Sequence, residues 1–160
     1  MSTLLVQVEF CLISRPLIPM SDDPNELEPL TPGHFLIGTS MQQIPDIDVG
    51  NIPTNRLKHW QATQKILQCF WKRWSTEYLT QLQGRAKRWQ PKVTISMGQL
   101  VVIREENIPP IRWKMGRIVQ LHPGTDGVVR VVTLKTITGL LKRPVEKLCL
   151  LPPASQPDNV

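Results

Sequence analysis

The sequence predicts an α+β fold, in which an N-terminal helix and an extended linker precede a long tryptophan-rich helix, or a helical pair, and a small β-barrel. Prolines are frequent before residue 54, and five of them lie between residues 16 and 32. No glycine or proline occurs from residue 54 to residue 83. Short β-branched runs separated by glycine turns then fill residues 92–152. Proline excludes helix interiors, and the spacing of apolar residues separates helices from strands.

The first two segments are residues 1–15 and 16–53. Apolar residues near helical spacing predict a short amphipathic helix over residues 3–15: Leu4, Leu5, Val8, Leu12 and Ile13. The prolines make residues 16–53 an extended linker, in which we expect "TPGH" to form a turn because Pro32 fixes φ and Gly33 accepts a positive value.

Residues 54–90 form the helical segment, with Thr54 or Asn55 as its N-cap. Large apolar side chains recur at helical spacing along it: Trp60, Leu67, Trp71, Trp74, Tyr78 and Leu82. A periodic aromatic stripe of this kind usually packs in a core. We therefore expect these side chains to support the fold rather than to form a platform for a ligand.

The β-branched runs and glycine turns of residues 92–152 predict four or five short strands, an arrangement typical of a small, strongly bent barrel. We expect strands at Leu100–Ile103 and Trp113–Leu121, with Gly116 as a bulge or bend. The turn "HPGTDG" and the strand "VVRVVTLKT" form the central hairpin, and "LLKRP" and "VEKLCLL" close the barrel. These residues are expected to fold without the first 50, with the helix as a lid, and residues 153–160 form a flexible tail.

Charge is distributed unevenly along the chain. Residues 1–54 contain one basic and seven acidic residues, whereas residues 55–147 contain 18 basic and five acidic ones, a net charge of +13. Such asymmetry points to an anionic partner for the second half, most commonly nucleic acid. Between residues 90 and 160 the only aromatic residue is Trp113, which disfavours a methyl-lysine cage and base stacking.

Duplex DNA, held by its phosphate backbone with little base readout, is therefore the expected partner. The candidate contacts are the basic residues at the end of the helix and on the barrel strands: Arg85, Lys87, Arg88, Arg112, Lys114, Arg117, Arg130, Lys142 and Arg143. The alternative is a protein-interaction or multimerisation module whose tryptophan helix packs against another protein.

Cofactors, metals and membranes find no support in the sequence. Cys11, Cys69 and Cys149 are widely spaced and odd in number, so we expect free thiols rather than a disulfide framework. No Cys-x-x-Cys or His-x₃-His spacing occurs, and no apolar run reaches the roughly 18 residues of a membrane span. Catalytic motifs and converging carboxylates are also missing.

Several longer motifs are similar to one family. In order along the chain they are "LTPGHFLIG", "WKRWSTEYLTQLQGRAKRW", "GQLVVI", "WKMGRIVQLHPGTDGVVRVVTLKT" and "KRPVEKLCLLP". Over residues 3–152 the chain resembles the C-terminal end of the integrase region in Pao/BEL-type retrotransposon polyproteins.

The resemblance implies that residues 1–15 correspond to the last helix of a ribonuclease-H-like catalytic core. It also implies that residues 92–152 form an SH3-like five-stranded barrel. The acidic catalytic triad of that family lies upstream, and Glu9 does not match it. We therefore expect a non-catalytic DNA-binding fragment that contributes to DNA integration, with a nuclear location, no cofactor, and other integrase protomers as further partners.

Overall fold

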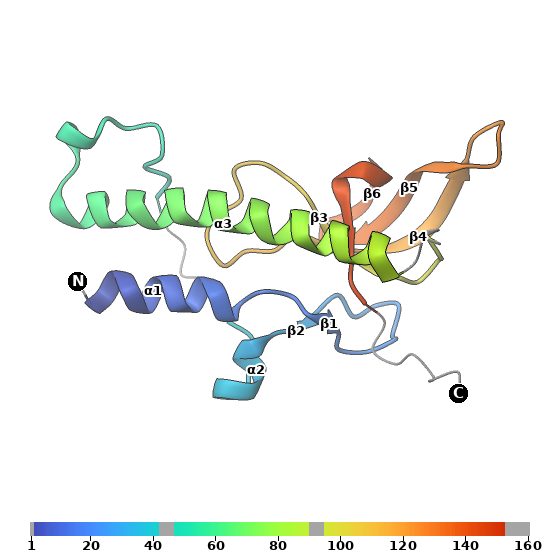
Figure 1. Ribbon diagram of the computed structural model, residues 1–160, viewed down its shortest axis with the longest axis horizontal. Helices are drawn as coiled ribbons and strands as arrows, with labels where there is room; N and C mark the ends of the chain where they lie inside the picture. Colours follow the sequence, from blue (N-terminus) through green and yellow to red (C-terminus); the bar gives the residue numbers. More distant parts are fainter. Residues whose placement is uncertain (1, 42–46, 90–94, 153–160) are drawn as a thin grey trace.

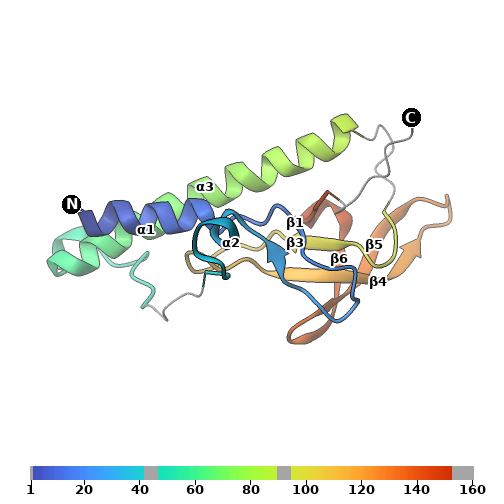
Figure 2. The same ribbon diagram turned by 90° about the horizontal axis from the view of Figure 1, so that it is seen from below.

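The computed structural model describes residues 2–41, 47–89 and 95–152, apart from the side chains of residues 2 and 84–89. Helix α1 (Ser2–Ile13) runs beside the first part of the long helix α3 (His59–Trp89), as Figures 1 and 2 show. Along the chain, a two-stranded sheet and the short helix α2 (Pro32–Ile37) come between these two helices. A five-stranded sheet follows α3, so the α+β fold with an N-terminal helix and one long helix is confirmed.

The five-stranded sheet is antiparallel throughout and has the strand order β6-β5-β4-β3-β7. Its strands are β3 (Leu100–Ile103), β4 (Met115–Pro123), β5 (Val129–Thr136), β6 (Gly139–Pro144) and β7 (Leu148–Leu150). The short 3₁₀ helix Val145–Lys147 returns the chain from β6 to β7. A meander whose last strand pairs back onto the first is consistent with a small SH3-like barrel.

The concave inner face of this sheet is the core of the barrel. Side chains alternate across each strand, and one set is buried together: Val101, Ile103, Ile118, Val132, Leu134 and Leu148. Gly116 belongs to the same face. A Cβ atom there would lie 3.3 Å from both the Ile103 and the Leu134 side chain, and the register shifts of β4 fall later in the strand. The expected bulge at Gly116 is therefore wrong, because this glycine makes room for its neighbours.

The outer face of the sheet is covered in part by α3. Leu79 and Leu82 of the helix pack against alternate residues of β3, β4 and β7 and against Leu151: Leu100, Val102, Met115 and Cys149. Trp71 is 3% exposed and packs with Cys11 of α1. The helix therefore shares one core with the barrel.

Four aromatic rings join the helix to the barrel. Trp113, just before β4, lies 4.8 Å from Trp71, 5.9 Å from Trp74 and 5.7 Å from Tyr78 between ring centroids, all edge to face. Its indole N–H donates to the Ser14 hydroxyl at 3.2 Å. The expectation that these aromatic residues pack in a core is confirmed for these rings, whereas Trp60 is 49% exposed.

Local details before α3 differ from the expectations. The "TPGH" segment begins α2 instead of forming a turn, because the Thr31 amide donates to His34 Nδ1 at 3.0 Å and Pro32 fits the first helical position. Gly38, with φ of 76°, ends the helix. Thr54 lies in a single 3₁₀ turn, Thr54–Arg56, and α3 begins only at His59.

Candidate nucleic-acid interface

The outer face of β4, β5 and β6 carries a polar stripe. The register pairs Arg117 with Lys135, and Thr133 with Lys142. Directly opposed residues in an antiparallel sheet project to the same side. Because Ile118, Val132 and Leu134 face the barrel core, this polar stripe must lie on the opposite surface.

Arg117 is not a free surface cation, and the expectation for it needs correction. Arg117 is only 4% exposed, although the sequence predicts that it reaches a phosphate. One terminal nitrogen donates to the Gly98 carbonyl at 2.7 Å, and the other donates to the carbonyls of Ser21 and Glu26 at 3.1 and 2.8 Å. The guanidinium thus fastens the N-terminal linker to the barrel.

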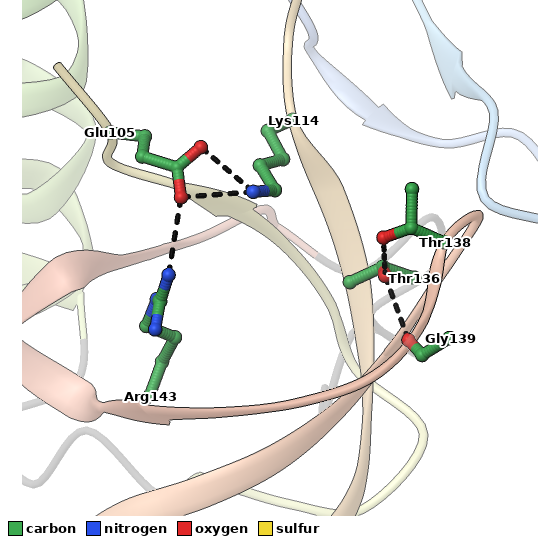
Figure 3. Close-up of polar contacts among 6 residues, drawn as sticks. All are labelled: Glu105, Lys114, Thr136, Thr138, Gly139 and Arg143. Carbon is green, nitrogen blue, oxygen red and sulfur yellow. Dashed lines mark hydrogen bonds and ion pairs between the residues drawn. The ribbon is translucent and has the colours of Figure 1, made fainter.

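Two further candidates share one carboxylate. Glu105, in the loop after β3, accepts hydrogen bonds from Lys114 Nζ at 2.7 and 2.9 Å and from Arg143 at 3.2 Å, as Figure 3 shows. Hydrogen bonding to Lys114 is the main cause that lowers the pKa of Glu105; burial opposes it, and the hydrogen bond from Arg143 adds to the lowering. Both cations remain about one-third exposed, so a phosphate still has access to them.

Arg130 is the second residue of β5, just after the turn of the central hairpin. It forms a bidentate ion pair with Asp126, at 2.6 and 3.1 Å, in the turn that joins β4 to β5. Its side chain is 65% exposed, and the pair is accessible to water. The Arg130 guanidinium and the Val128 amide lower the pKa of Asp126. An exposed pair of this type is weak and exchanges readily for another anion.

Arg112 and Lys142 are two further candidates on the surface of the barrel. Both are exposed, and neither forms an ion pair within the part of the chain that the structure describes. The remaining three candidates, Arg85, Lys87 and Arg88, lie in the last turns of α3. Their side chains lie outside the described residues.

A basic cluster that the sequence did not reveal forms where β3 ends. The Arg104 amide donates to the Lys147 carbonyl at 2.8 Å, because β3 and β7 are antiparallel neighbours. Glu105, the residue after Arg104, accepts hydrogen bonds from Lys114 and Arg143. This cluster is called the β3-end cluster below, and its members are Arg104, Lys114, Arg143 and Lys147. Glu105 and two further exposed acidic residues in the same segments, Glu106 and Glu146, lower the local positive charge.

The sequence contains only a weak indication that Arg104 and Lys147 belong to this cluster. Arg104 follows a buried strand directly, and Lys147 precedes one, so each stands at a strand end. Only the pairing of Ile103 with Leu148 shows that these ends meet. Strand register over 45 residues depends on tertiary packing and not on local sequence.

The described residues also bear on metal sites, membrane spans and disulfides. Among them, no three His, Cys, Asp or Glu side chains are grouped closely enough to hold a metal ion. Within the same residues, no helix combines the length and apolarity needed to cross a bilayer. All three cysteines are free; Cys11 and Cys149 are buried and Cys69 is exposed.

Comparison with known proteins gives one relationship. No curated protein and no solved structure matches the chain. Residues 58–151 match the model of a family of unknown function, DUF5641. The match begins just before α3 and ends one residue after β7, so it contains both the helix and the barrel that share a core. It covers more than half of the chain, which therefore belongs to the family DUF5641.

Proposed function

We propose that the chain is a non-catalytic DNA-binding fragment of a retrotransposon integrase. It holds duplex DNA by its phosphate backbone, through cations carried on the barrel. The observation that carries the proposal is the β3-end cluster, in which the backbones of Arg104 and Lys147 are hydrogen-bonded and the neighbouring Glu105 binds Lys114 and Arg143. Guanidinium and ammonium groups on a rigid frame suffice for phosphate contact without sequence readout.

Three further features support this reading. Arg112, Arg130 and Lys142 add exposed cations on the barrel. The second half of the chain has a net charge of +13, counted over residues 55–147. Trp113 is packed against three other rings of the core, which disfavours a role in stacking on a base. The resemblance to the C-terminal integrase region of Pao/BEL-type elements favours DNA integration as the process and the nucleus as the place.

The absence of catalysis is part of the same proposal. The acidic triad of the family that the chain resembles has no counterpart among the motifs of this chain. Glu9 is an exposed residue of α1. Purified chain incubated with duplex DNA and magnesium or manganese is expected to leave the DNA intact. Metal-dependent nicking that disappears in Glu9→Gln would contradict this.

A salt titration of duplex binding tests the central claim. Each phosphate contact releases condensed counterions, so log K falls with log salt by about 0.9 per contact. Four to six contacts give a slope of about −4 to −5. The triple variant Arg112→Ala, Arg130→Ala, Lys142→Ala should flatten the slope by about one unit for each residue that touches a phosphate.

The matched control removes the same charge from α3 and the residue before it: Lys58→Ala, Lys72→Ala, Arg73→Ala. These side chains are exposed, and they lie outside the barrel. We expect the control to weaken binding slightly and to preserve most of the slope. Affinity that is independent of salt, or a difference above about tenfold between unrelated duplexes, contradicts backbone holding.

The second candidate function is protein interaction or multimerisation within an integrase or chromatin complex. One observation favours it: Phe35, Leu36 and Ile37 of α2 are consecutive apolar residues that are 73%, 66% and 54% exposed. Exposed apolar clusters mark association surfaces. Analytical ultracentrifugation should then show concentration-dependent association that Phe35→Ser and Leu36→Ser abolish. The same variants should not change DNA binding if the first proposal is correct.

A further inference from the structure

Residues 20–28, "MSDDPNELE", form an acidic loop that is called the strap below. The paired strands β1 (Ile18–Pro19) and β2 (Pro29–Leu30) close it at its base. Within it, the Glu26 amide donates to the Asp23 carbonyl at 3.1 Å, so the loop has internal order. The strap contains four acidic residues and no basic one: Asp22, Asp23, Glu26 and Glu28.

The strap lies across the polar stripe of the barrel. Arg117 reaches two of its carbonyls, those of Ser21 and Glu26, and Lys135 Nζ lies 2.5 Å from the Asn25 side-chain oxygen. Arg117 and Lys135 are partners in the register of β4 and β5, so they project side by side. Figures 1 and 2 show the loop between β1 and β2 extending to β4. One segment therefore covers two neighbouring cations.

The charge of Arg117 is balanced in an unusual way. A buried guanidinium normally has a carboxylate partner, since the desolvation of an unpaired charge is costly. Within the described residues, however, the Arg117 hydrogen bonds go to carbonyl oxygens, and its buried Nε has no hydrogen-bond partner. Carbonyl dipoles compensate a full charge less well than an anion does. A phosphate group is thus a stronger partner for this side chain than the strap.

Removing the strap would extend the candidate interface. Arg117 and Lys135 would become accessible beside Lys142, which stands on the neighbouring strand β6 opposite Thr133. The three cations would then lie on one face of β4, β5 and β6, where Lys142 stands diagonally across from Lys135 and Leu140 is the direct partner of Lys135. The strap covers one end of the polar stripe and leaves Lys142 exposed at the other.

We propose that the strap is an autoinhibitory cover, which competes with duplex DNA for Arg117 and Lys135. This inference rests on the proposed function, because it names the regulation of that same DNA-binding surface. In the closed state the acidic loop repels DNA and occupies the two cations. In the open state these cations contact phosphates, and the apparent Kd equals the intrinsic Kd divided by the fraction of open molecules.

The first experiment neutralises the strap in the full chain: Asp22→Asn, Asp23→Asn, Glu26→Gln, Glu28→Gln. The control makes the same change in net charge at acidic residues that belong neither to the strap nor to the segments of the β3-end cluster: Glu9→Gln, Asp48→Asn, Glu77→Gln, Asp158→Asn. If about one-tenth of the wild-type molecules are open, the strap variant gains about tenfold in duplex affinity relative to the control. Equal gains in the two variants would overturn the inference, because they would reflect net charge alone.

The second experiment strengthens the strap with an isosteric change. Asn25→Asp places a carboxylate against Lys135, at the position where the amide oxygen lies 2.5 Å from Nζ. Duplex affinity should fall about two- to fivefold more than in the control Asn51→Asp, as expected for a partly exposed ion pair. Asn51 is exposed and lies outside the strap. Equal effects of the two substitutions would also overturn the inference.

Hydrogen exchange provides a readout that does not depend on mutation. Addition of duplex DNA to the wild-type chain should increase exchange at the amides of residues 20–28 while it protects the barrel. Unchanged or increased protection of the strap in the complex would contradict competition. If no variant binds duplex DNA at any salt concentration, the proposed function fails and this inference with it. Binding with equal responses in strap and control variants removes only the inference.

Discussion

The Arg117 guanidinium and the Glu26 carbonyl oxygen are 2.8 Å apart, although 91 positions separate them in the sequence. Together with the bonds to Ser21 and Gly98, this contact joins three segments at one buried charge. Arg117→Ala leaves those carbonyls without this donor, and we expect a loss of about 3 kcal/mol in the free energy of unfolding. Chemical denaturation measures this change.

Arg117→Lys is the informative control for that loss. Lysine keeps the charge but lacks the planar fork that reaches acceptors on both sides. It should recover only part of the stability, and hydrogen exchange in residues 20–28 should remain faster than in the wild-type chain. Full recovery by lysine would mean that charge alone, and not the directed hydrogen bonds, holds the linker.

Glu105 restrains two cations of the β3-end cluster, so its removal should affect binding and stability in opposite directions. Glu105→Gln frees Lys114 and Arg143, and the salt slope of duplex binding should steepen by up to about two contacts. Because the carboxylate is 35% exposed, the free energy of unfolding should fall by less than about 1 kcal/mol.

The effect of pH on the same residue has a defined sign. The folded-state pKa of Glu105 is lowered, so its stabilising contribution is present above the unfolded-state pKa and is lost as pH falls through the folded value. The wild-type chain and Glu105→Gln should therefore differ at neutral pH and converge in acid. A difference that persists at the lowest pH at which both remain folded would mean that the hydrogen bonds do not depend on the charge.

The three thiols should react very differently in the native chain. Burial raises the pKa of Cys11 and of Cys149 to about 11, whereas Cys69 is exposed on α3. Thiolate is the reacting form, so a thiol reagent at mildly alkaline pH should modify one cysteine quickly and two only on unfolding. Mass spectrometry identifies the labelled residue. Rapid labelling of Cys149 would show that α3 does not stay packed on the barrel.

The strands were predictable because their signal is local. The predicted strand Leu100–Ile103 begins and ends at the same residues in the structure. The hairpin of β4 and β5 follows from the glycines in the turn and the β-branched residues beside it. The aromatic core was also predictable from its helical spacing. α2 was missed because proline and glycine signal a turn, while proline also suits the first position of a helix.

The candidate site was less predictable than the fold. Arg117 has the same residue type and strand context as an exposed cation, but contacts with the distant strap and with Gly98 bury it. The β3-end cluster depends on the pairing of residues 103 and 148, which no local pattern encodes. Side-chain accessibility is a property of tertiary contacts, so charge counting identifies the basic region without showing which of its members are free.

The barrel alone should not be stable, contrary to the expectation from the sequence. A chain of residues 92–152 exposes the apolar face that Leu79 and Leu82 cover, including Leu100, Val102 and Met115. A domain of about 60 residues already buries only about 60% of its unfolded surface, so it has little stability to lose. Residues 54–152, which keep the helix, should fold. Circular dichroism and urea denaturation of both chains distinguish the cases: a cooperative transition is expected only for the longer one. A similar transition for residues 92–152 would mean that the inner face of the barrel suffices and that α3 is an accessory to it.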